Sequence, residues 1–156
     1  MDERSKIIED YGTVIKLEII KHFLGDYLGS GTARDVFSFN VDLVVKIEQK
    51  SFSFQNVNEY NITEYLKGTE WGKWIAPIHS ISSCGIMVLQ TKAIPLKSLD
   101  QLPDKIPNFF TDLKLSNYGY IGKQFVAIDY GLTNLEYIGL NSVKLVKVNK
   151  KKWNQS

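Results

Sequence analysis

The segment from Gly25 to Glu48 constrains the fold most, because its composition favours short strands joined by tight turns. It is rich in β-branched and aromatic residues, contains several glycines, and includes the turn sequence Asn40-Val41-Asp42. β-Branched and aromatic side chains favour strands, whereas glycine, asparagine and aspartate favour the turns between them. The segment is therefore predicted to form strands connected as hairpins, near residues 26–30, 34–40 and 43–48.

The rest of the chain adds one helix and further strands. Residues 55–67 are predicted to form a helix that ends at Gly68. Its mixed apolar face would consist of Val57, Tyr60, Ile62 and Tyr65. Two strands are predicted near 75–82 and 85–91, and a second hairpin over 118–121 and 124–129. The stretch punctuated by prolines at 95, 103 and 107 is expected to hold only short helical turns. This order predicts an α+β fold in which an antiparallel sheet carries one packed helix.

The N-terminal residues 3–23 carry an apolar stripe at helical spacing. Its members are Ile7, Ile8, Tyr11, Ile15, Ile19 and Phe23. Gly12 weakens the predicted helix, because a glycine inside a helix costs about 1 kcal/mol relative to alanine. The stripe is expected to pack on the body of the protein, and binding of a partner is the alternative.

Composition favours a soluble globular protein over a membrane protein or a nucleic-acid-binding protein. The 156 residues include 44% hydrophobic and 23% charged residues, the balance of a soluble globular protein with one domain or two packed lobes. The net charge of +2 disfavours nucleic acid as the main partner. No run approaches the ~20 apolar residues of a membrane span, and no signal-peptide segment is recognised. A cytoplasmic protein is expected, in which the lone Cys84 is a buried, unpaired side chain.

Two polar patterns fall within the first predicted strands. Gly29-Ser30-Gly31 separates the first two strands, and such a turn lets backbone N–H groups approach phosphate oxygens, although a plain hairpin can have the same sequence. Lys46 lies in the apolar run Val44–Ile47 on the third strand. A buried ammonium group needs an acidic partner, for which the following helix offers Glu59 or Glu64. Alternatively, Lys46 points to water.

The most specific pattern is a set of oxygen-bearing side chains near the second predicted hairpin. Asp112 is followed five positions later by Asn117, and Asp129 follows the apolar strand Val126–Ile128. Magnesium takes hard oxygen ligands from few side chains and keeps phosphate oxygens and water for the rest. The pattern predicts a magnesium site, although aspartate and asparagine are also common in turns.

Together these patterns resemble the protein-kinase signature set in its usual order. GSGTARDV resembles the glycine-rich loop, VVKI the strand lysine, DLKLSN the catalytic loop and DYG the metal-binding D-F-G motif. The resemblance covers roughly residues 25–133 and implies ATP and Mg²⁺ as cofactors. It implies a five-stranded antiparallel N-lobe sheet with one helix, and a strongly truncated C-lobe. The chain would comprise a helical segment (1–24), the N-lobe (25–92) and the C-lobe (93–156).

The resemblance also implies a role for each matching residue. Lys46 would hold the phosphates and pair with Glu59, while Gln90, in the hinge segment 87–92, would lie at the adenine. The residues that would cover the phosphates are Gly29, Ser30, Gly31 and Arg34. Asp112 would be the catalytic base and Lys114 would steady the transferred phosphoryl group. The residues that would bind magnesium are Asn117 and Asp129.

Three departures from the kinase pattern stand out. Arg34 replaces the third glycine, which stiffens the loop or brings a guanidinium to a phosphate. Phe110-Thr111 replaces the usual His-Arg before Asp112, which weakens the expected support of the catalytic loop. The chain ends at Ser156 with no Ala-Pro-Glu segment, which leaves no room for the large helical lobe that docks peptide substrates. In this compactness the chain resembles kinase-like proteins encoded by some bacteriophages, which would act in the host cytoplasm.

These patterns support three functional hypotheses. The first is an ATP- and magnesium-dependent phosphotransferase acting on a Ser/Thr-type hydroxyl of a host or partner protein. The second is a kinase-like binding module, or pseudokinase, that engages a partner protein without phosphoryl transfer. Its contact surface would include the basic tail Lys147–Trp153, unless that tail is a frayed terminus. The third is nucleic-acid binding, which the low net charge disfavours. Its aromatic residues would be Tyr118, Tyr120, Tyr137 and Trp153.

Overall fold

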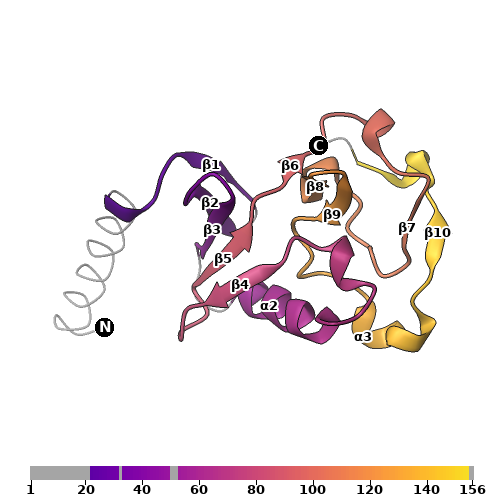
Figure 1. The fold of residues 1–156 in the computed structure, drawn as a ribbon, viewed down its shortest axis with the longest axis horizontal. Helices are drawn as coiled ribbons and strands as arrows, with labels where there is room; N and C mark the ends of the chain where they lie inside the picture. Colours follow the sequence, from indigo (N-terminus) through magenta and orange to yellow (C-terminus); the bar gives the residue numbers. More distant parts are fainter. Residues whose placement is uncertain (1–21, 32, 50–52, 155–156) are drawn as a thin grey trace.

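The computed structural model describes residues 22–31, 33–49 and 53–154. Most of the helix predicted over 3–23 therefore lies outside the described residues. The described part consists of a five-stranded sheet with one long helix, followed by two smaller sheets and several short helices (Figure 1). No helix in this part is long and apolar enough to cross a membrane.

The five-stranded sheet is antiparallel and has the strand order β1-β2-β3-β5-β4. The strands are β1 (Tyr27–Ser30), β2 (Arg34–Ser38), β3 (Leu43–Glu48), β4 (Ile78–Ile81) and β5 (Met87–Thr91). The predicted α+β fold with a five-stranded antiparallel sheet is confirmed. Strand β3 is central, and Lys46 in it pairs with Val36 of β2 and Val88 of β5. The sheet therefore holds Lys46 firmly from both sides.

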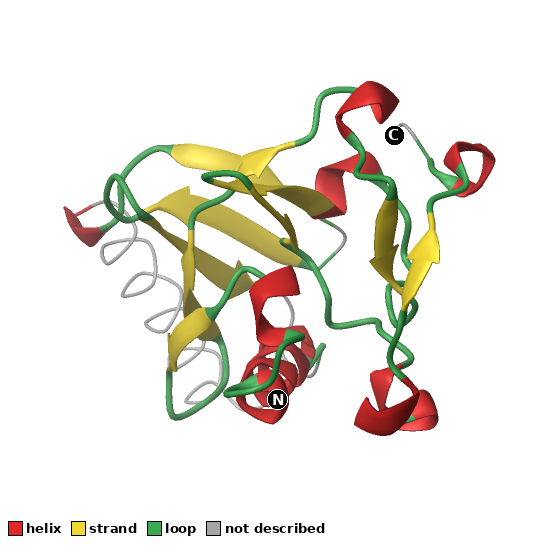
Figure 2. Ribbon diagram, turned by 45° about the vertical axis from the view of Figure 1, so that its right-hand side comes forward, coloured by secondary structure: helices red, strands yellow, loops and turns green. Residues whose placement is uncertain are grey.

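Helix α2 (Gln55–Leu66) follows β3 and lies against one face of the sheet (Figure 2). Its buried side chains are Asn56, Glu59, Thr63 and Leu66. Spacings of three and four place them on one side of the helix. The predicted mixed apolar face is therefore wrong in part: Tyr65 is 50% exposed, whereas Ile62 is half-buried and packs against the main core. The helix packs through polar side chains because each finds a hydrogen-bond partner, as when Asn56 donates to the Ile86 carbonyl at 2.7 Å.

Beyond β5 the chain forms two smaller sheets. The first has the order β6-β8-β9, and the second pairs β7 with β10. The predicted hairpin is confirmed as β8 and β9, whereas the proline-punctuated stretch contributes the short strands β6 and β7 in addition to a helical turn. The strands are β6 (Ile94–Pro95), β7 (Lys105–Pro107), β8 (Tyr118–Ile121), β9 (Gln124–Ala127) and β10 (Leu145–Lys147). The short helices are η1 (Gly72–Trp74), η2 (Leu99–Gln101), η3 (Leu115–Asn117), α3 (Leu135–Ile138), η4 (Leu140–Ser142) and η5 (Lys150–Lys152).

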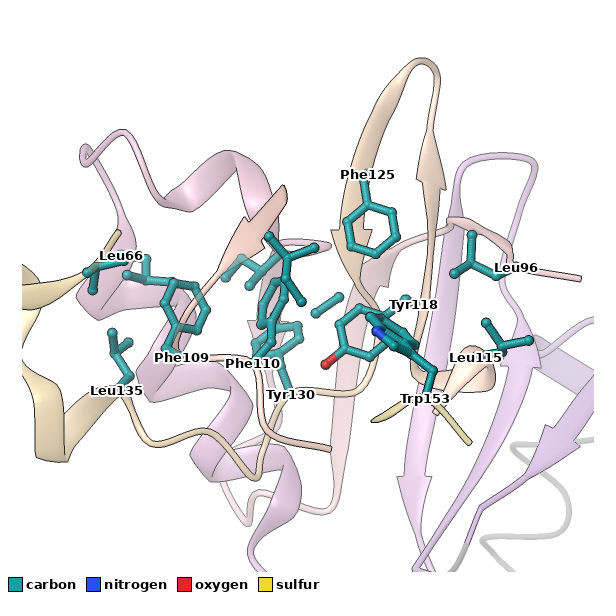
Figure 3. Close-up of a cluster of buried hydrophobic side chains, with 14 residues drawn as sticks. Leu66, Leu96, Phe109, Phe110, Leu115, Tyr118, Phe125, Tyr130, Leu135 and Trp153 are labelled. Carbon is teal, nitrogen blue, oxygen red and sulfur yellow. The ribbon is translucent and has the colours of Figure 1, made fainter. Parts of the chain in front are cut away.

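An aromatic cluster forms the main core of this second part (Figure 3). Tyr118 stacks on Phe125 with ring centroids 5.6 Å apart, and Trp153 meets Tyr118 edge-on at 4.8 Å. Trp153 is only 6% exposed, so the expectation of a frayed basic terminus is wrong at this residue. Its indole is buried in the core and holds the segment around residue 153 in place. Burial of Tyr118 and Trp153 also removes two of the four aromatic rings that the nucleic-acid hypothesis requires.

Cys84 is exposed, contrary to the expected burial. It lies in the turn between β4 and β5, where Gly85 adopts a φ of 74°. The backbone reverses there between Ser83 and Gly85, which leaves the cysteine exposed in the turn of a hairpin.

Candidate functional site

Lys46 and Glu59 form a buried ion pair between β3 and α2. The Lys46 Nζ lies 3.0 Å from Oε2 of Glu59, and the two side chains are 3% and 0% exposed. Lys46 also donates to the backbone carbonyl of Ile128 at 2.6 Å. Burial lowers the pKa of Lys46, although Glu59 opposes that shift. The alternative partner, Glu64, is exposed and pairs with Lys67 on the helix surface.

A second cation reaches the same carboxylate. Arg34, the first residue of β2, donates from Nη1 to Oε2 of Glu59 at 2.8 Å and from Nη2 to Oε1 at 2.9 Å. Two parallel bonds of this kind fix both groups in one plane. Burial alone would raise the pKa of Glu59, but the charges of Lys46 and Arg34 outweigh it and lower the pKa to about 2. Glu59 is therefore ionised at neutral pH.

Arg34 also contacts the aspartate predicted to bind metal. Its Nη2 donates to Oδ1 of Asp129 at 2.8 Å, and its Nη1 donates to Oδ1 of Asn56 at 3.3 Å. The prediction placed Arg34 at the phosphates, whereas its side chain points inward to two carboxylates and is 4% exposed. Burial lowers the pKa of the guanidinium, but Glu59 and Asp129 raise it by more, and the net shift is upward. The sequence signal for this contact was the arginine in place of the third glycine.

One backbone carbonyl joins the two segments predicted to bind metal. The carbonyl oxygen of Asn117 accepts hydrogen bonds from the N–H groups of Ile128 at 2.7 Å and Asp129 at 3.2 Å. The next N–H, of Tyr130, donates to Oε1 of Glu59 at 2.9 Å. The Asp129 side chain is 43% exposed, so its carboxylate has one side toward Arg34 and another toward solvent. Burial and the nearby charge of Glu59 raise its pKa.

Asp112, Lys114 and Asn117 lie together on one loop. Oδ2 of Asp112 accepts a hydrogen bond from Nδ2 of Asn117 at 2.9 Å. The Lys114 Nζ lies 3.6 Å from Oδ1 of Asp112. Both carboxylate oxygens therefore have a neighbour that holds them in place, while the side chain stays about one third exposed.

The C-terminal residues support this loop. The N–H of Leu115 donates to the carbonyl of Asn154 at 3.1 Å, and the N–H of Asn154 donates to the carbonyl of Leu113 at 2.8 Å. These bonds place Asn154 beside Lys114 in a short parallel bridge. The sequence interpretation missed this support, and the signal that could have revealed it was a tryptophan directly after three lysines. The bridge supplies support that Phe110-Thr111 were expected to lack.

The glycine turn between β1 and β2 is open on its outer side. Gly29 has a φ of 155°, and among the described residues, its chain neighbours aside, none has a heavy atom within 4 Å of the position that a Cβ would take. At Gly31 the nearest such atom is the Arg34 carbonyl oxygen at 4.0 Å. Ser30 between them is exposed. A ligand can therefore approach the backbone of this turn without meeting side chains from the glycines.

Gln90 is fully buried, and its amide points into the protein. Its Nε2 donates to the backbone carbonyls of Ala76 at 3.0 Å and Ile128 at 3.1 Å. Lys46 uses the same Ile128 carbonyl, so Gln90 and Lys46 both hold β5 and β3 against the segment that leads to Asp129. This arrangement gives Gln90 a positioning role, and its contact with adenine stays a prediction.

The residues present fit a magnesium ion that takes few protein ligands. Among the described residues, no three His, Cys, Asp or Glu side chains form a metal-binding group. Asp129 nevertheless keeps Oδ2 apart from the Arg34 contact, and Asn117 keeps its carboxamide oxygen because its nitrogen binds Asp112. Two such oxygens suit magnesium, which retains water and phosphate oxygens for its other positions.

The predicted residues thus form one connected network, except for Gly29, Ser30 and Gly31, which lie at its edge in the turn before Arg34. A cavity of about 410 Å³ lies elsewhere, at the C-terminal end of α2 near Gly72 and His79. None of the predicted site residues lines it. The polar network, not this cavity, therefore defines the candidate site.

No protein-family model matches the chain, and no curated protein matches it. Among solved structures it resembles the streptomycin–ATP–APH(2″)-IIa ternary complex, with a TM-score of 0.41 and 16% sequence identity. The match covers 55% of this chain and 29% of the other, so the chain spans less than a third of that protein's length. What the site does is therefore inferred from its own residues.

Proposed function

We propose that this protein binds ATP with magnesium and transfers the terminal phosphoryl group to a hydroxyl acceptor. The observation that carries the proposal is the contact of Lys46 with the segment just before Asp129. Lys46 donates to the carbonyl of Ile128, 82 positions away along the chain, and pairs with Glu59 in the same network. Hydrogen bonds thus link this cation to the segment of the half-exposed Asp129 and, through the Asn117 carbonyl, to the loop that carries Asp112.

Each group has a distinct task in phosphoryl transfer. Lys46 attracts the non-transferred phosphates through its positive charge, and its position is fixed because Glu59 and Ile128 hold its ammonium group. Asp112 accepts the proton of the acceptor hydroxyl as the hydroxyl oxygen bonds to the γ-phosphorus and the bond from that phosphorus to the bridging oxygen breaks. Lys114, 3.6 Å from Asp112, lies where it can balance charge on the transferred group. Catalysis of phosphoryl transfer depends mainly on positioning the reacting groups and on stabilising the charge of the transferred phosphoryl group.

Asn117 and Asp129 are the residues that would hold magnesium. When bound, the ion neutralises negative charge on the phosphate oxygens. The backbone bond from Asp129 to the Asn117 carbonyl keeps both side chains on adjoining segments.

Nucleotide binding is tested by thermal or chemical unfolding with ATP and magnesium. Ligand at about 100 times its dissociation constant should add about 2.7 kcal/mol to the unfolding free energy. Lys46→Met should lose most of this increase, whereas Lys67→Met, which changes an exposed lysine directly after α2, should keep it. An unchanged unfolding curve of the parent protein with ATP and magnesium would contradict the proposal.

Transfer is tested separately with ATP labelled on the γ-phosphate, using the protein itself, generic protein acceptors and water as acceptors. Asp112→Asn should lower the rate by roughly 10²–10⁴, the usual contribution of a general base. Asp104→Asn, an exposed aspartate outside the network, is the matched control and should retain the rate. Equal rates in Asp112→Asn and the parent would refute the assigned base. Binding without transfer to any acceptor would favour the binding-module hypothesis.

A further inference from the structure

Arg34 carries a positive charge that the ion pair of Lys46 and Glu59 does not require. The ammonium group of Lys46 lies within 3.3 Å of Oε1 and 3.0 Å of Oε2 of Glu59. Tyr130 donates a third bond to that carboxylate through its N–H group. The charge of Glu59 is thus already neutralised, and its oxygens are hydrogen-bonded, without Arg34. The positive charge of Arg34 is therefore available to the second carboxylate partner that it contacts.

That partner is Asp129, the carboxylate on the open side of the network. Arg34 reaches it at 2.8 Å, and Asp129 is 43% exposed while Glu59 is fully buried. The network contains two cations and two carboxylates, so their charges cancel. Its members are Arg34, Lys46, Glu59 and Asp129. Without Arg34 the group would carry one net negative charge, and Asp129 would present it to an incoming ligand.

The charge of Arg34 is permanent and fixed in position. A guanidinium group does not lose its proton in proteins, and the bonds to Glu59 and Asn56 hold its plane. It cannot dissociate as a bound ion does. Its effect on Asp129 is therefore present before any ligand arrives.

An unneutralised carboxylate at this place would repel phosphate oxygens strongly, because charge interactions are weakly screened in a partly buried site. We propose that Arg34 is a built-in cation that lets the site bind a nucleoside triphosphate without a divalent metal ion. Metal is then needed for phosphoryl transfer and not for binding. This inference rests on the proposed function, since it concerns the nucleotide at that same site.

The test is a fluorescence titration with ATP carrying an N-methylanthraniloyl label, once with magnesium and once with EDTA. The parent protein should give dissociation constants within about threefold of each other. A loss of more than tenfold in EDTA would overturn the inference while leaving the proposed function intact. Absence of binding under both conditions would instead refute the proposed function, so the two failures are distinguishable.

Variants assign the effect to the charge of Arg34. Arg34→Gln should lower the affinity in EDTA at least tenfold, and magnesium should recover most of the loss. Adding Asp129→Asn to Arg34→Gln removes the excess negative charge and should restore binding in EDTA, which a merely structural role of Arg34 would not predict. Lys67→Gln removes one exposed positive charge elsewhere and should change neither constant.

Folding of each variant is checked by its melting transition. Should Arg34→Gln not fold, Asp129→Asn alone provides the second arm, because it removes the carboxylate that Arg34 neutralises. It should bind the labelled nucleotide in EDTA at least as tightly as the parent. Weaker binding of Asp129→Asn in EDTA, or failure of the double variant to recover binding, would overturn the inference.

Discussion

Trp153 packs edge-on against Tyr118, with ring centroids 4.8 Å apart, and so attaches the end of the chain to the strand that follows the loop of Asp112. The next residue, Asn154, continues this attachment through two backbone hydrogen bonds to Leu113 and Leu115. The C-terminal residues therefore act as part of the framework of the candidate site. Because the helices described beyond β5 are only three or four residues long, these contacts contribute directly to the support of the loop.

Trp153→Ala should destabilise the protein by about 3–5 kcal/mol, because it leaves a cavity in the aromatic core. The measurement is urea unfolding followed by circular dichroism. Tyr137→Ala is the matched control, since Tyr137 is an aromatic residue in the same part of the chain but is 92% exposed. It should change stability by less than about 0.5 kcal/mol. Equal effects of the two substitutions would mean that the indole does not contribute to the core.

Thr63 and Tyr130 should be energetically coupled. Their hydroxyl oxygens lie 2.8 Å apart in the interior, and Tyr130 also donates to the Ala76 carbonyl at 2.8 Å. Thr63→Val leaves the buried phenol with one bond fewer, which should cost about 1–2 kcal/mol. A double-mutant cycle with Tyr130→Phe should give a coupling energy of about 0.5–1.5 kcal/mol. Strictly additive effects would contradict this contact between α2 and the segment after Asp129.

Two glycines should respond differently to the same substitution. A Cβ at Gly119 would clash with the Ile94 carbonyl oxygen, which belongs to the paired strand β6. Gly119→Ala should therefore destabilise the protein by roughly 1–3 kcal/mol through overpacking. Gly31→Ala meets no atom closer than 4.0 Å and should leave stability nearly unchanged. The comparison uses the midpoints of urea unfolding, and a larger loss for Gly31→Ala would contradict the structure.

Strand patterns and turn residues were sufficient to predict the sheet. The third strand was predicted over 43–48 and forms over Leu43–Glu48, because β-branched residues there are bounded by turns. The helix after it was also located, at Gln55–Leu66, but its buried face was predicted only in part. A mixed apolar face was expected, whereas three of its four buried residues are the polar Asn56, Glu59 and Thr63. Hydrophobic periodicity cannot reveal a helix that packs through hydrogen bonds.

For the candidate site, the sequence predicted which residues take part, but it predicted few of the contacts between them. The contact of Lys46 with Glu59 was expected, and Glu64 could be set aside only when the structure placed it at the surface. The inward turn of Arg34 was not foreseen, since it depends on two carboxylates that are distant in the chain. The bridge to Asn154 was missed for the same reason. Pairings between remote segments have no local pattern.

Acid should weaken the network through Glu59. Its pKa in the folded protein is about 2, against 4.5 for the free side chain, because Lys46 and Arg34 outweigh the effect of burial. A lowered folded-state pKa contributes stability that is fully present above about pH 4.5 and is lost as the pH falls toward 2. For Glu59 the loss should amount to about 3 kcal/mol. The measurement is the unfolding free energy between pH 7 and pH 2.5.

Two glutamine variants assign this acid dependence to one residue. Glu59→Gln should be less stable at pH 7, because Arg34 and Lys46 lose their shared carboxylate, but its stability should depend less on pH than that of the parent. Glu64→Gln, on the exposed side of the same helix, should follow the parent curve. If Glu59→Gln loses as much stability in acid as the parent does, the carboxylate is not held ionised by the two cations, and the charge balance inferred around Asp129 fails with it.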